Sequence, residues 1–321
     1  MLILELSAFF EAKNYIQQRI FMRVVSIFLI ILLVCTMVFG FAGCHIEEAP
    51  QNLPFKLMSY NMRVNPFTSG DKRVEYDSVR ERAHLILQHI AEEDPDIICV
   101  QEWTPVHEMY VKKGLKETYA MQSYDRGDTE MCAIFFKESR FELVDSEVFW
   151  LSETPNEASV IEGGSHPRIY ASVVLRDKNT NKQLRIATTH LEIAYEALEK
   201  QRKMVVDYTA ESNIPALVCG DFNLSEESKL YPYCTRMLDD CRLVAPGAVT
   251  TATYNGYNLV ADEKVLDSNG NVLDGVGHPI DHIFIKKHSF EVIRYDVLNY
   301  LIDGMFSSDH FPLVVELKIN D

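Results

Sequence analysis

Short polar motifs at the ends of strand-like runs constrain this chain more than any other feature. Most follow a run of apolar residues that is typical of a buried strand. Acids, amides and imidazoles at strand ends can converge on one edge of a sheet, so the motifs predict a single site built from distant segments. In chain order they are Ser59-Tyr60-Asn61, Gln101-Glu102, Thr189-His190-Leu191-Glu192, Gly220-Asp221-Phe222-Asn223, Ile280-Asp281-His282 and Ser307-Ser308-Asp309-His310.

The chain from residue 55 alternates strand and helix patterns. Apolar residues at helical spacing predict helices over 76–92, 106–117 and 190–208. A polar, glycine-rich insertion follows over 256–279, whose acids could bind a cation or narrow the pocket. Strands with helices on their outer faces predict an α/β fold, a two-sheet sandwich in a single domain over 55–321. The expected strands are 56–60, 97–100, 132–136, 141–150, 169–175, 184–188, 216–219, 280–286, 291–298 and 313–319.

Residues 1–44 have the pattern of a signal peptide. A charged stretch precedes an apolar run over 24–34, and Ala42-Gly43-Cys44 supplies a small-residue cleavage site. The stretch before Met22 is long and mixed in charge for a signal peptide, so Met22 is the expected start. The alternative is a transmembrane anchor, because the longer apolar run from Val24 to Ala42 is about long enough to span a bilayer.

Ala-Gly-Cys at 42–44 resembles the processing site of a bacterial lipoprotein, in which the cysteine is lipidated. Phe41 stands where a leucine is usual, so cleavage without lipidation is the alternative. Residues 45–54 then form a polar tether. We therefore expect an exported protein, either held at the membrane through an N-terminal lipid or signal anchor in the cell envelope, or secreted.

The cysteines give weaker information. Cys99 and Cys219 lie in strand-like runs and are expected to be core thiols. Cys234 and Cys241 are close in a loop-rich stretch and could pair in an oxidising compartment. There is no Cys-x-x-Cys, which disfavours a structural zinc site.

In their order and spacing, the polar motifs resemble those of the endonuclease/exonuclease/phosphatase superfamily, the metal-dependent phosphoesterases that include nocturnin-like deadenylases. The resemblance runs from about Phe55 to Lys318, and the segment from Phe149 to Pro155 is similar to one in bacterial members. It implies a deoxyribonuclease-like four-layer architecture with the site at one end, between the sheets. It also implies a phosphoester substrate, which could be a small molecule, a lipid head group or a nucleic acid.

Three residues are expected to hold the metal. Glu102 is a carboxylate after a buried strand, preceded by an amide, and it suits a hard cation such as Mg²⁺ or Mn²⁺. Asn61 is expected to support the ion or donate to a phosphate oxygen. Asp309 is expected to turn toward the ion. Each residue alone could be an ordinary turn or surface residue, and only the ordered set favours the site.

Four residues are expected to carry the chemistry near the metal. His310 is the expected general base, or the electrophile beside the scissile phosphate, because imidazole titrates near neutral pH. Asp281 is expected to fix its tautomer and raise its basicity. Asp221 and Asn223 lie two residues apart and would face one way in an extended segment. One would orient water and the other would donate to phosphate.

His190 is the fifth expected catalytic residue, and Arg168, Tyr254 and Asn255 are assigned to substrate binding. His190, which we expect to begin a helix, resembles the second histidine of the family and would contact phosphate or protonate the leaving oxygen. Arg168 is expected to clamp phosphate with its planar guanidinium. Tyr254 and Asn255 are expected to line the substrate side, although Asn-Gly is also a turn signal. Glu192 stands where many relatives carry Asp, and we leave it outside the core site.

The sequence therefore predicts phosphodiester hydrolysis by metal- and histidine-activated water. Phosphomonoester or lipid-head-group hydrolysis are the alternatives. The formal net charge of −16 argues against a tight non-specific DNA binder, because such binding relies on Lys and Arg. A non-catalytic module that captures a phosphate or glycan is an alternative from another class. Such a module is expected to lose some of the key acids or His310, and none is missing. No protein partner can be inferred.

Overall fold

The computed structural model describes residue 22 and residues 51–64, 78–248, 251–256, 260–261, 264–265 and 278–320. Pro50–Asp321 forms one compact unit. The predicted signal segment 1–44, Met22 apart, the first part of the tether and most of the acidic insertion 256–279 lie outside the described residues. Across the described ranges, no helix is both long and apolar enough to cross a bilayer.

The first sheet has six strands in the order β13-β14-β1-β2-β4-β3. β1 and β2 are parallel and are connected through helix α2 (Val79–Glu93), whereas β4 lies antiparallel to β2. Ser78 caps the start of α2 by accepting a hydrogen bond from the Glu81 N–H, and Asp94 ends the helix in a left-handed conformation. The strands are β1 (Phe55–Asn61), β2 (Ile97–Trp103), β3 (Tyr119–Asp125), β4 (Met131–Lys137), β13 (Phe290–Val297) and β14 (Leu313–Ile319).

The second sheet also has six strands, in the order β5-β6-β7-β8-β12-β9. β7 and β8 are parallel and are connected through α5 (Tyr195–Ala210), and β12 lies antiparallel to β8. Two short helices, α6 (Tyr231–Met237) and α7 (Cys241–Val244), flank β9 in the chain. The strands are β5 (Phe141–Trp150), β6 (Ile169–Asp177), β7 (Gln183–His190), β8 (Ala216–Asp221), β9 (Leu238–Asp240) and β12 (Asp281–Lys286).

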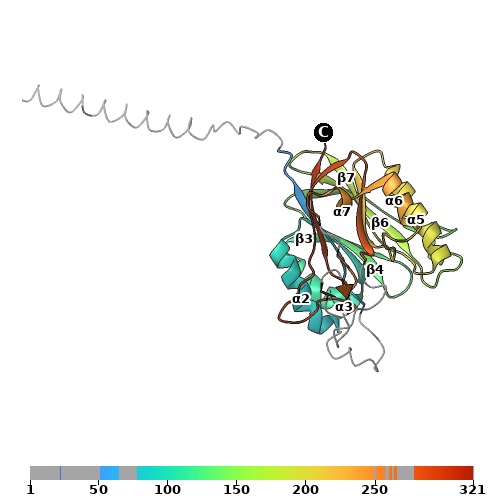
Figure 1. Cartoon of the computed structure of the whole chain (residues 1–321). Coiled ribbons are helices and arrows are strands. Elements are labelled where there is room, and N and C mark those ends of the chain that lie inside the picture. The colour runs from blue at the N-terminus through green and yellow to red at the C-terminus, as the bar shows by residue number, and fades with distance from the viewer. Residues whose placement is uncertain are drawn as a thin grey trace, which may run out of the picture. The chain divides into compact units, whose positions relative to one another are not determined.

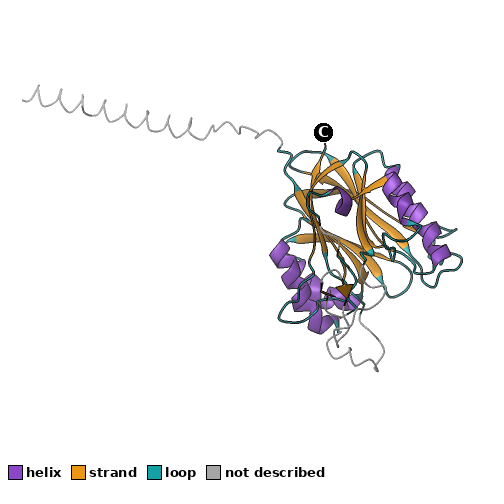
Figure 2. Cartoon of the chain, viewed as in Figure 1, coloured by secondary structure: helices purple, strands orange, loops and turns teal. Residues whose placement is uncertain are grey.

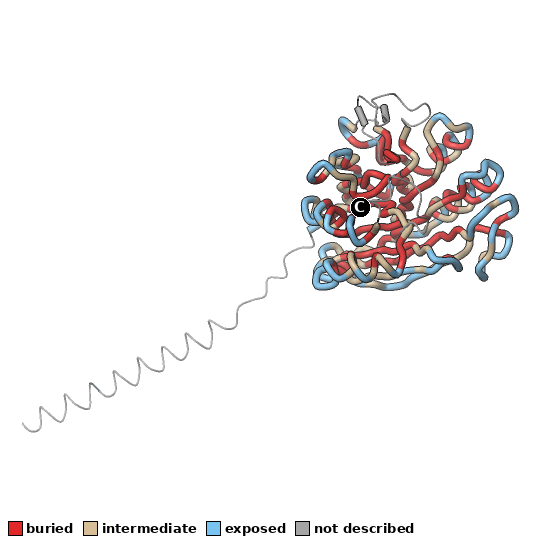
Figure 3. The backbone as a smooth tube through the Cα atoms, turned by 90° about the horizontal axis from the view of Figure 1, so that it is seen from below, coloured by how far each residue is buried: buried red, intermediate tan, exposed pale blue. Residues whose placement is uncertain are grey.

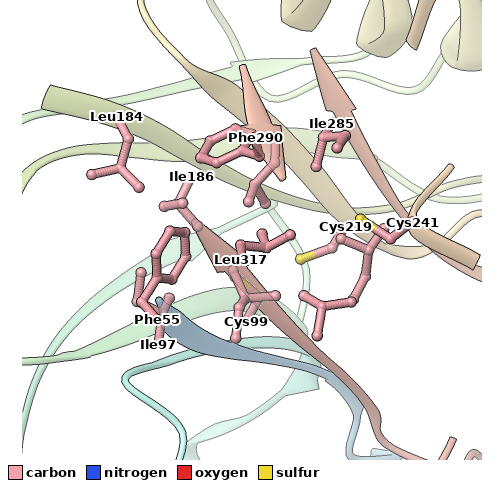
Figure 4. Packing of buried hydrophobic residues seen from close by; sticks show 14 of the residues in the cluster. Phe55, Ile97, Cys99, Leu184, Ile186, Cys219, Cys241, Ile285, Phe290 and Leu317 are labelled. Carbon is pink, nitrogen blue, oxygen red and sulfur yellow. The ribbon is translucent and has the colours of Figure 1, made fainter. Parts of the chain in front are cut away.

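The two sheets face each other, with α2 on the outer side of one sheet and α5 and α6 on the outer side of the other (Figures 1 and 2). Buried side chains from both sheets, such as Phe55, Ile186 and Leu317, fill the space between them (Figure 4). Each such side chain stabilises the fold by about 1.5–3 kcal/mol. Burial is concentrated along the strands, and exposure along the outer turns (Figure 3). The predicted two-sheet α/β sandwich is therefore confirmed.

The structure differs from the sequence prediction in three local details. The helix expected over 106–117 is present as a continuous helical segment over 105–115, but its middle is a π-helical turn over Glu108–Lys112 between α3 (Pro105–His107) and α4 (Lys113–Leu115). Strand β3 was not predicted, because it lies at the sheet edge and is mostly half-exposed. The helix expected from His190 begins only at Tyr195. His190 instead ends β7, because it stays paired with Asp221 of β8.

The five cysteines in the described residues are all buried and free. Cys99 and Cys219 belong to the core between the sheets, as predicted (Figure 4). Cys234 and Cys241 do not form the disulfide that their spacing allowed.

Two very short strands, β10 (Val260–Ala261) and β11 (Lys264–Val265), form a separate two-stranded sheet.

Candidate functional site

The site lies where two pairs of parallel strands, one pair in each sheet, end and the antiparallel strand β12 begins. Asn61, Glu102, His190 and Asp221 are at or near the carboxyl ends of their strands, and Asp281 starts β12 directly opposite Asp221. Their side chains border a cavity of about 580 Å³ or support its wall. The described residues that line it are Val64, Glu102, Glu130, Ser165, His166, Arg168, His190, Glu192, Ile193, Ala194, Asp221, Asn223, Tyr254, Ile280, Asp309 and His310.

The side-chain amide of Asn61 joins the two sheets. Its Nδ2 donates to Glu102 Oε1 and to Asp221 Oδ2, each at 3.0 Å. Its Oδ1 accepts a hydrogen bond from the Arg63 backbone N–H at 3.0 Å. Glu102 also accepts from the Val64 N–H at 2.6 Å and has a positive φ of 58°, a strained conformation of the kind that clusters at functional sites. The Asn61 amide thus holds the Glu102 carboxylate of one sheet and the Asp221 carboxylate of the other close to each other.

His310 lies between two buried carboxylates. Its Nδ1 is 2.8 Å from Asp281 Oδ2, and its Nε2 is 3.6 Å from Asp221 Oδ2. Burial alone would lower the pKa of His310, but Asp281 and Asp221 outweigh burial and hold this pKa well above its usual value. Burial and then the charge of Asp281 raise the pKa of Asp221 to about 7. The arrangement can therefore hold and exchange a proton near neutral pH.

His190 adjoins the same Asp221 oxygen as His310. Its Nε2 is 3.5 Å from Asp221 Oδ2, and its Nδ1 is 3.9 Å from Glu130 Oε2. Burial, followed by the charges of Arg168 and Arg126, holds the pKa of His190 well below its usual value, so the imidazole is neutral. Burial and then the charge of Glu102 raise the pKa of the Glu130 carboxyl to about 7. Glu130 is a cavity residue that the sequence reasoning missed.

Arg168 and Glu192 form a buried ion pair in the cavity wall. Arg168 Nε donates to Glu192 Oε1 at 3.1 Å. The carboxylate also accepts from the Ser165 hydroxyl at 3.0 Å and from the His166 N–H at 3.1 Å. Arg168 Nη1 is buried and has no hydrogen-bond partner among the described residues. Glu192, which the sequence analysis leaves outside the core site, therefore fixes Arg168, and Nη1 keeps a hydrogen-bonding capacity that no described residue satisfies.

Tyr254 and Asn255 take different positions. Tyr254 lines the cavity, and its ring packs edge-on against His310 with centroids 5.0 Å apart. Asn255 is fully buried behind the lining, and its Nδ2 donates to the Ser308 carbonyl. Asn255 is therefore not among the residues that line the cavity, and its amide instead holds the loop before His310.

Asn223 and Asp309 line the cavity, but both have partners in the chain. The Asn223 N–H donates to Asp221 Oδ1 and its Nδ2 donates to the Leu191 carbonyl, each at 2.9 Å. One amide hydrogen of Asn223 is therefore already engaged. The Asp309 carboxylate forms an ion pair with the Arg63 guanidinium.

The donor set fits a divalent cation. Asp221, Asp281 and His310 offer ligand atoms that all lie within 4.8 Å of one another, and Glu102 reaches Asp221 through the shared Asn61 amide. The crowding of these carboxylates contributes to the raised pKa of Asp221, a repulsion that a bound cation would relieve. Carboxylate and amide oxygens are the ligands that Mg²⁺ and Mn²⁺ prefer.

Comparison with known proteins identifies the family. The model of the Endonuclease/Exonuclease/phosphatase family matches residues 58–310. The chain belongs to this family. Rat (Rattus norvegicus) nocturnin is 23% identical over 304 residues, which cover 84% of this chain and 66% of nocturnin. The chain thus spans slightly less than two thirds of that relative.

Solved structures show the same fold in bacterial members of the family. A Bacteroides thetaiotaomicron endonuclease/exonuclease/phosphatase family protein is 27% identical with a TM-score of 0.71, over 84% of this chain and 98% of that one. A mannosyl-6-phosphatase from the same species is 26% identical with a TM-score of 0.68, over 82% and 99%. The predicted family and the predicted deoxyribonuclease-like sandwich are both confirmed.

Proposed function

We propose that the chain is a metal-dependent phosphoesterase that hydrolyses a phosphodiester by direct attack of water. The decisive observation is the Asn61 amide, which links Glu102 to Asp221 while His310 and Asp281 adjoin the same Asp221 carboxylate. Ligands for a cation, a proton acceptor and donors for phosphate thereby border one cavity. In the reaction, an oxygen–phosphorus bond forms to water, the ester bond breaks, and the leaving alcohol takes up a proton.

Glu102 and Asn61 would hold Mg²⁺ or Mn²⁺, with Asp309 supporting them from the Arg63 side. His310 Nδ1 is engaged by Asp281, so these two side chains would serve proton transfer, while Asp221 lies close enough to Glu102, through the shared Asn61 amide, to face the ion as well. When bound, the ion supplies charge neutralisation for the phosphate.

The side chains of the protein would then accept the proton of water and donate hydrogen bonds to the phosphate. Asp221 accepts the proton of the attacking water, which suits its raised pKa. His310, whose pKa is raised by Asp281 and Asp221, would face the phosphate as an imidazolium and donate a hydrogen bond to it. The proton that Asp221 takes from water balances the proton that the leaving alcohol takes up. The buried Nη1 of Arg168 and the neutral His190 donate to phosphate and leaving oxygens.

Charge balance supports a diester over a monoester. Each arginine that the described residues bring to this region is matched by a carboxylate, in the pairs Arg63–Asp309, Arg168–Glu192 and Arg126–Glu130. Apart from the His310 imidazolium, these described residues leave no surplus positive charge for the second charge of a phosphomonoester. A monoester is the alternative, because a similar structure is that of a mannosyl-6-phosphatase.

We also propose that the protein is exported and tethered to the membrane through lipidated Cys44. This proposal is supported by the sequence pattern of residues 1–44 alone. Metabolic labelling with a fatty acid, compared with a Cys44→Ala variant, would test it. Label that persists in the variant would contradict it.

Hydrolysis of bis-(p-nitrophenyl) phosphate and of its monoester tests the proposed activity. The protein would be residues 45–321, which contain the compact unit, assayed with Mg²⁺, Mn²⁺ or EDTA beside Asp221→Asn. We expect diester cleavage that EDTA and the substitution abolish. Activity that survives either treatment would overturn the mechanism, and faster monoester cleavage would favour the phosphatase alternative.

A further inference from the structure

Arg82 is a buried arginine that lies outside the cavity lining. It comes from α2 and is 1% exposed. Its Nη1 donates to the Met62 carbonyl at 2.7 Å and to the Ser307 carbonyl at 2.8 Å, and its Nη2 donates to the Arg63 carbonyl at 2.9 Å. Burying a guanidinium is costly unless hydrogen bonds replace its water. Here backbone carbonyls supply these hydrogen bonds, and they come from two segments near opposite ends of the compact unit, Met62–Arg63 and Ser307.

The two segments carry opposite halves of the candidate site. Met62 and Arg63 follow Asn61, whose amide bridges the carboxylates of the metal side. Ser307 precedes the segment that carries Asp309 and His310. The guanidinium of Arg82 therefore spans the junction between the metal side and the proton-transfer side.

Two further hydrogen bonds cross the same junction. The Tyr60 hydroxyl donates to Ser307 Oγ at 2.6 Å, and the Ser308 hydroxyl donates to the Asn61 carbonyl at 2.7 Å. Ser308 Oγ in turn accepts from the His310 N–H at 3.2 Å. The backbone of Asn61 is thus connected to the backbone of His310 through the Ser308 hydroxyl. Arg82 holds the same two segments through its hydrogen bonds to their backbone carbonyls.

We propose that Arg82 is a positioning residue that sets the distance between the Asn61–Glu102 metal side and His310. The guanidinium suits this role because its planar fork reaches separate carbonyls at once, whereas a lysine ammonium is a single point charge on a flexible stem. Groups that orient the residues of a metal site commonly change metal affinity or activity by about 10- to 100-fold when altered. The activity part of this inference rests on the proposed function, and the metal-binding part does not.

Arg82→Lys tests the inference, with Arg80→Lys as the matched control from the exposed side of the same helix. Mn²⁺ binding is measured by electron paramagnetic resonance without substrate, well below the midpoint of thermal unfolding of each variant. We expect Arg82→Lys to bind Mn²⁺ roughly 10-fold more weakly and to lose about 10- to 100-fold in kcat on bis-(p-nitrophenyl) phosphate. KM should change by less than about threefold, because the substrate contacts remain. Arg80→Lys should match the wild type.

Ser308→Ala provides a second variant in case Arg82→Lys does not fold, because it removes the Asn61–Ser308 bond at the same junction. It should weaken Mn²⁺ binding and kcat in the same direction. Wild-type Mn²⁺ affinity in both folded variants would overturn the inference. A wild type that binds Mn²⁺ but hydrolyses no phosphoester would refute the proposed function, while the Mn²⁺ affinities would still decide the role of Arg82.

Discussion

Asp281→Asn is the substitution that most directly tests the proposed proton-transfer pair. Asp281 Oδ2 lies 2.8 Å from His310 Nδ1, and both side chains are buried. Asparagine keeps the shape and removes the charge, so His310 loses a partner that raises its pKa. A hydrogen bond to a charged group contributes about 1.5–3 kcal/mol, and about 1.36 kcal/mol is tenfold in rate. We therefore expect kcat/KM to fall roughly 10- to 150-fold.

The pH dependence of kcat/KM distinguishes the roles of His310. If His310 acts as an imidazolium, activity falls as pH rises through its pKa. Asp281 raises that pKa, so its loss moves the alkaline fall to lower pH. If His310 were instead the general base, only the rise of kcat/KM on the acid side of the profile would move to lower pH. The assay is bis-(p-nitrophenyl) phosphate hydrolysis at saturating Mg²⁺ across pH 5–10.

Asp240→Asn is the matched control. Asp240 Oδ2 lies 3.1 Å from His282 Nδ1, both side chains are buried, and neither lines the cavity. This variant should lose stability while keeping the wild-type pH profile. An Asp281→Asn enzyme with an unmoved alkaline fall and kcat/KM within about twofold of wild type would refute the reasoning.

Two further predictions concern stability. Glu192→Ala leaves the Arg168 guanidinium buried without its carboxylate, so it should lower the free energy of unfolding by about 3–5 kcal/mol in urea titrations. The control, Glu142→Ala, breaks an exposed ion pair with Arg176 and should lower it by at most about 1 kcal/mol. Equal small losses would contradict this. The Glu130 pKa is raised from 4.5 to about 7, so the folded state binds the proton more tightly and stability falls as pH rises across this range. In EDTA, Glu130→Gln should therefore gain in Tm over wild type at pH 8 but not at pH 4.5, and a constant difference would count against it.

The sequence predicted those site residues that lie at the carboxyl ends of parallel strands. Asn61, Glu102 and Asp221 all follow buried apolar runs. Asn61 and Glu102 lie at the ends of neighbouring parallel strands in the first sheet, and Asp221 ends a strand of the second sheet. The structure places all three side chains within one hydrogen-bonded group. Their roles in metal binding and hydrolysis remain proposals.

The missed features share a physical cause, which is pairing that only the folded sheet reveals. Glu130 immediately precedes β4 in a charged turn, and it enters the cavity because β4 runs antiparallel to β2, with Met131 opposite Trp103. His190 looks helical because apolar residues continue beyond it, yet the ladder with β8 holds it in a strand. The pairing of Arg168 with Glu192 depends on tertiary contact and leaves no local signal in either segment.

The electrostatic cost of the site favours an enzyme over a passive binding module. Burial and neighbouring acids raise the pKa of both Asp221 and Glu130 to about 7, so the folded chain resists the charged forms of these carboxylates. Without an ion, the free energy of unfolding must then decrease as pH approaches neutrality. A divalent cation between the two sheets would oppose that loss, and a neutral glycan would not. Groups perturbed by burial and by specific charge partners in a cavity are concentrated at catalytic sites, so this cluster supports metal-dependent hydrolysis.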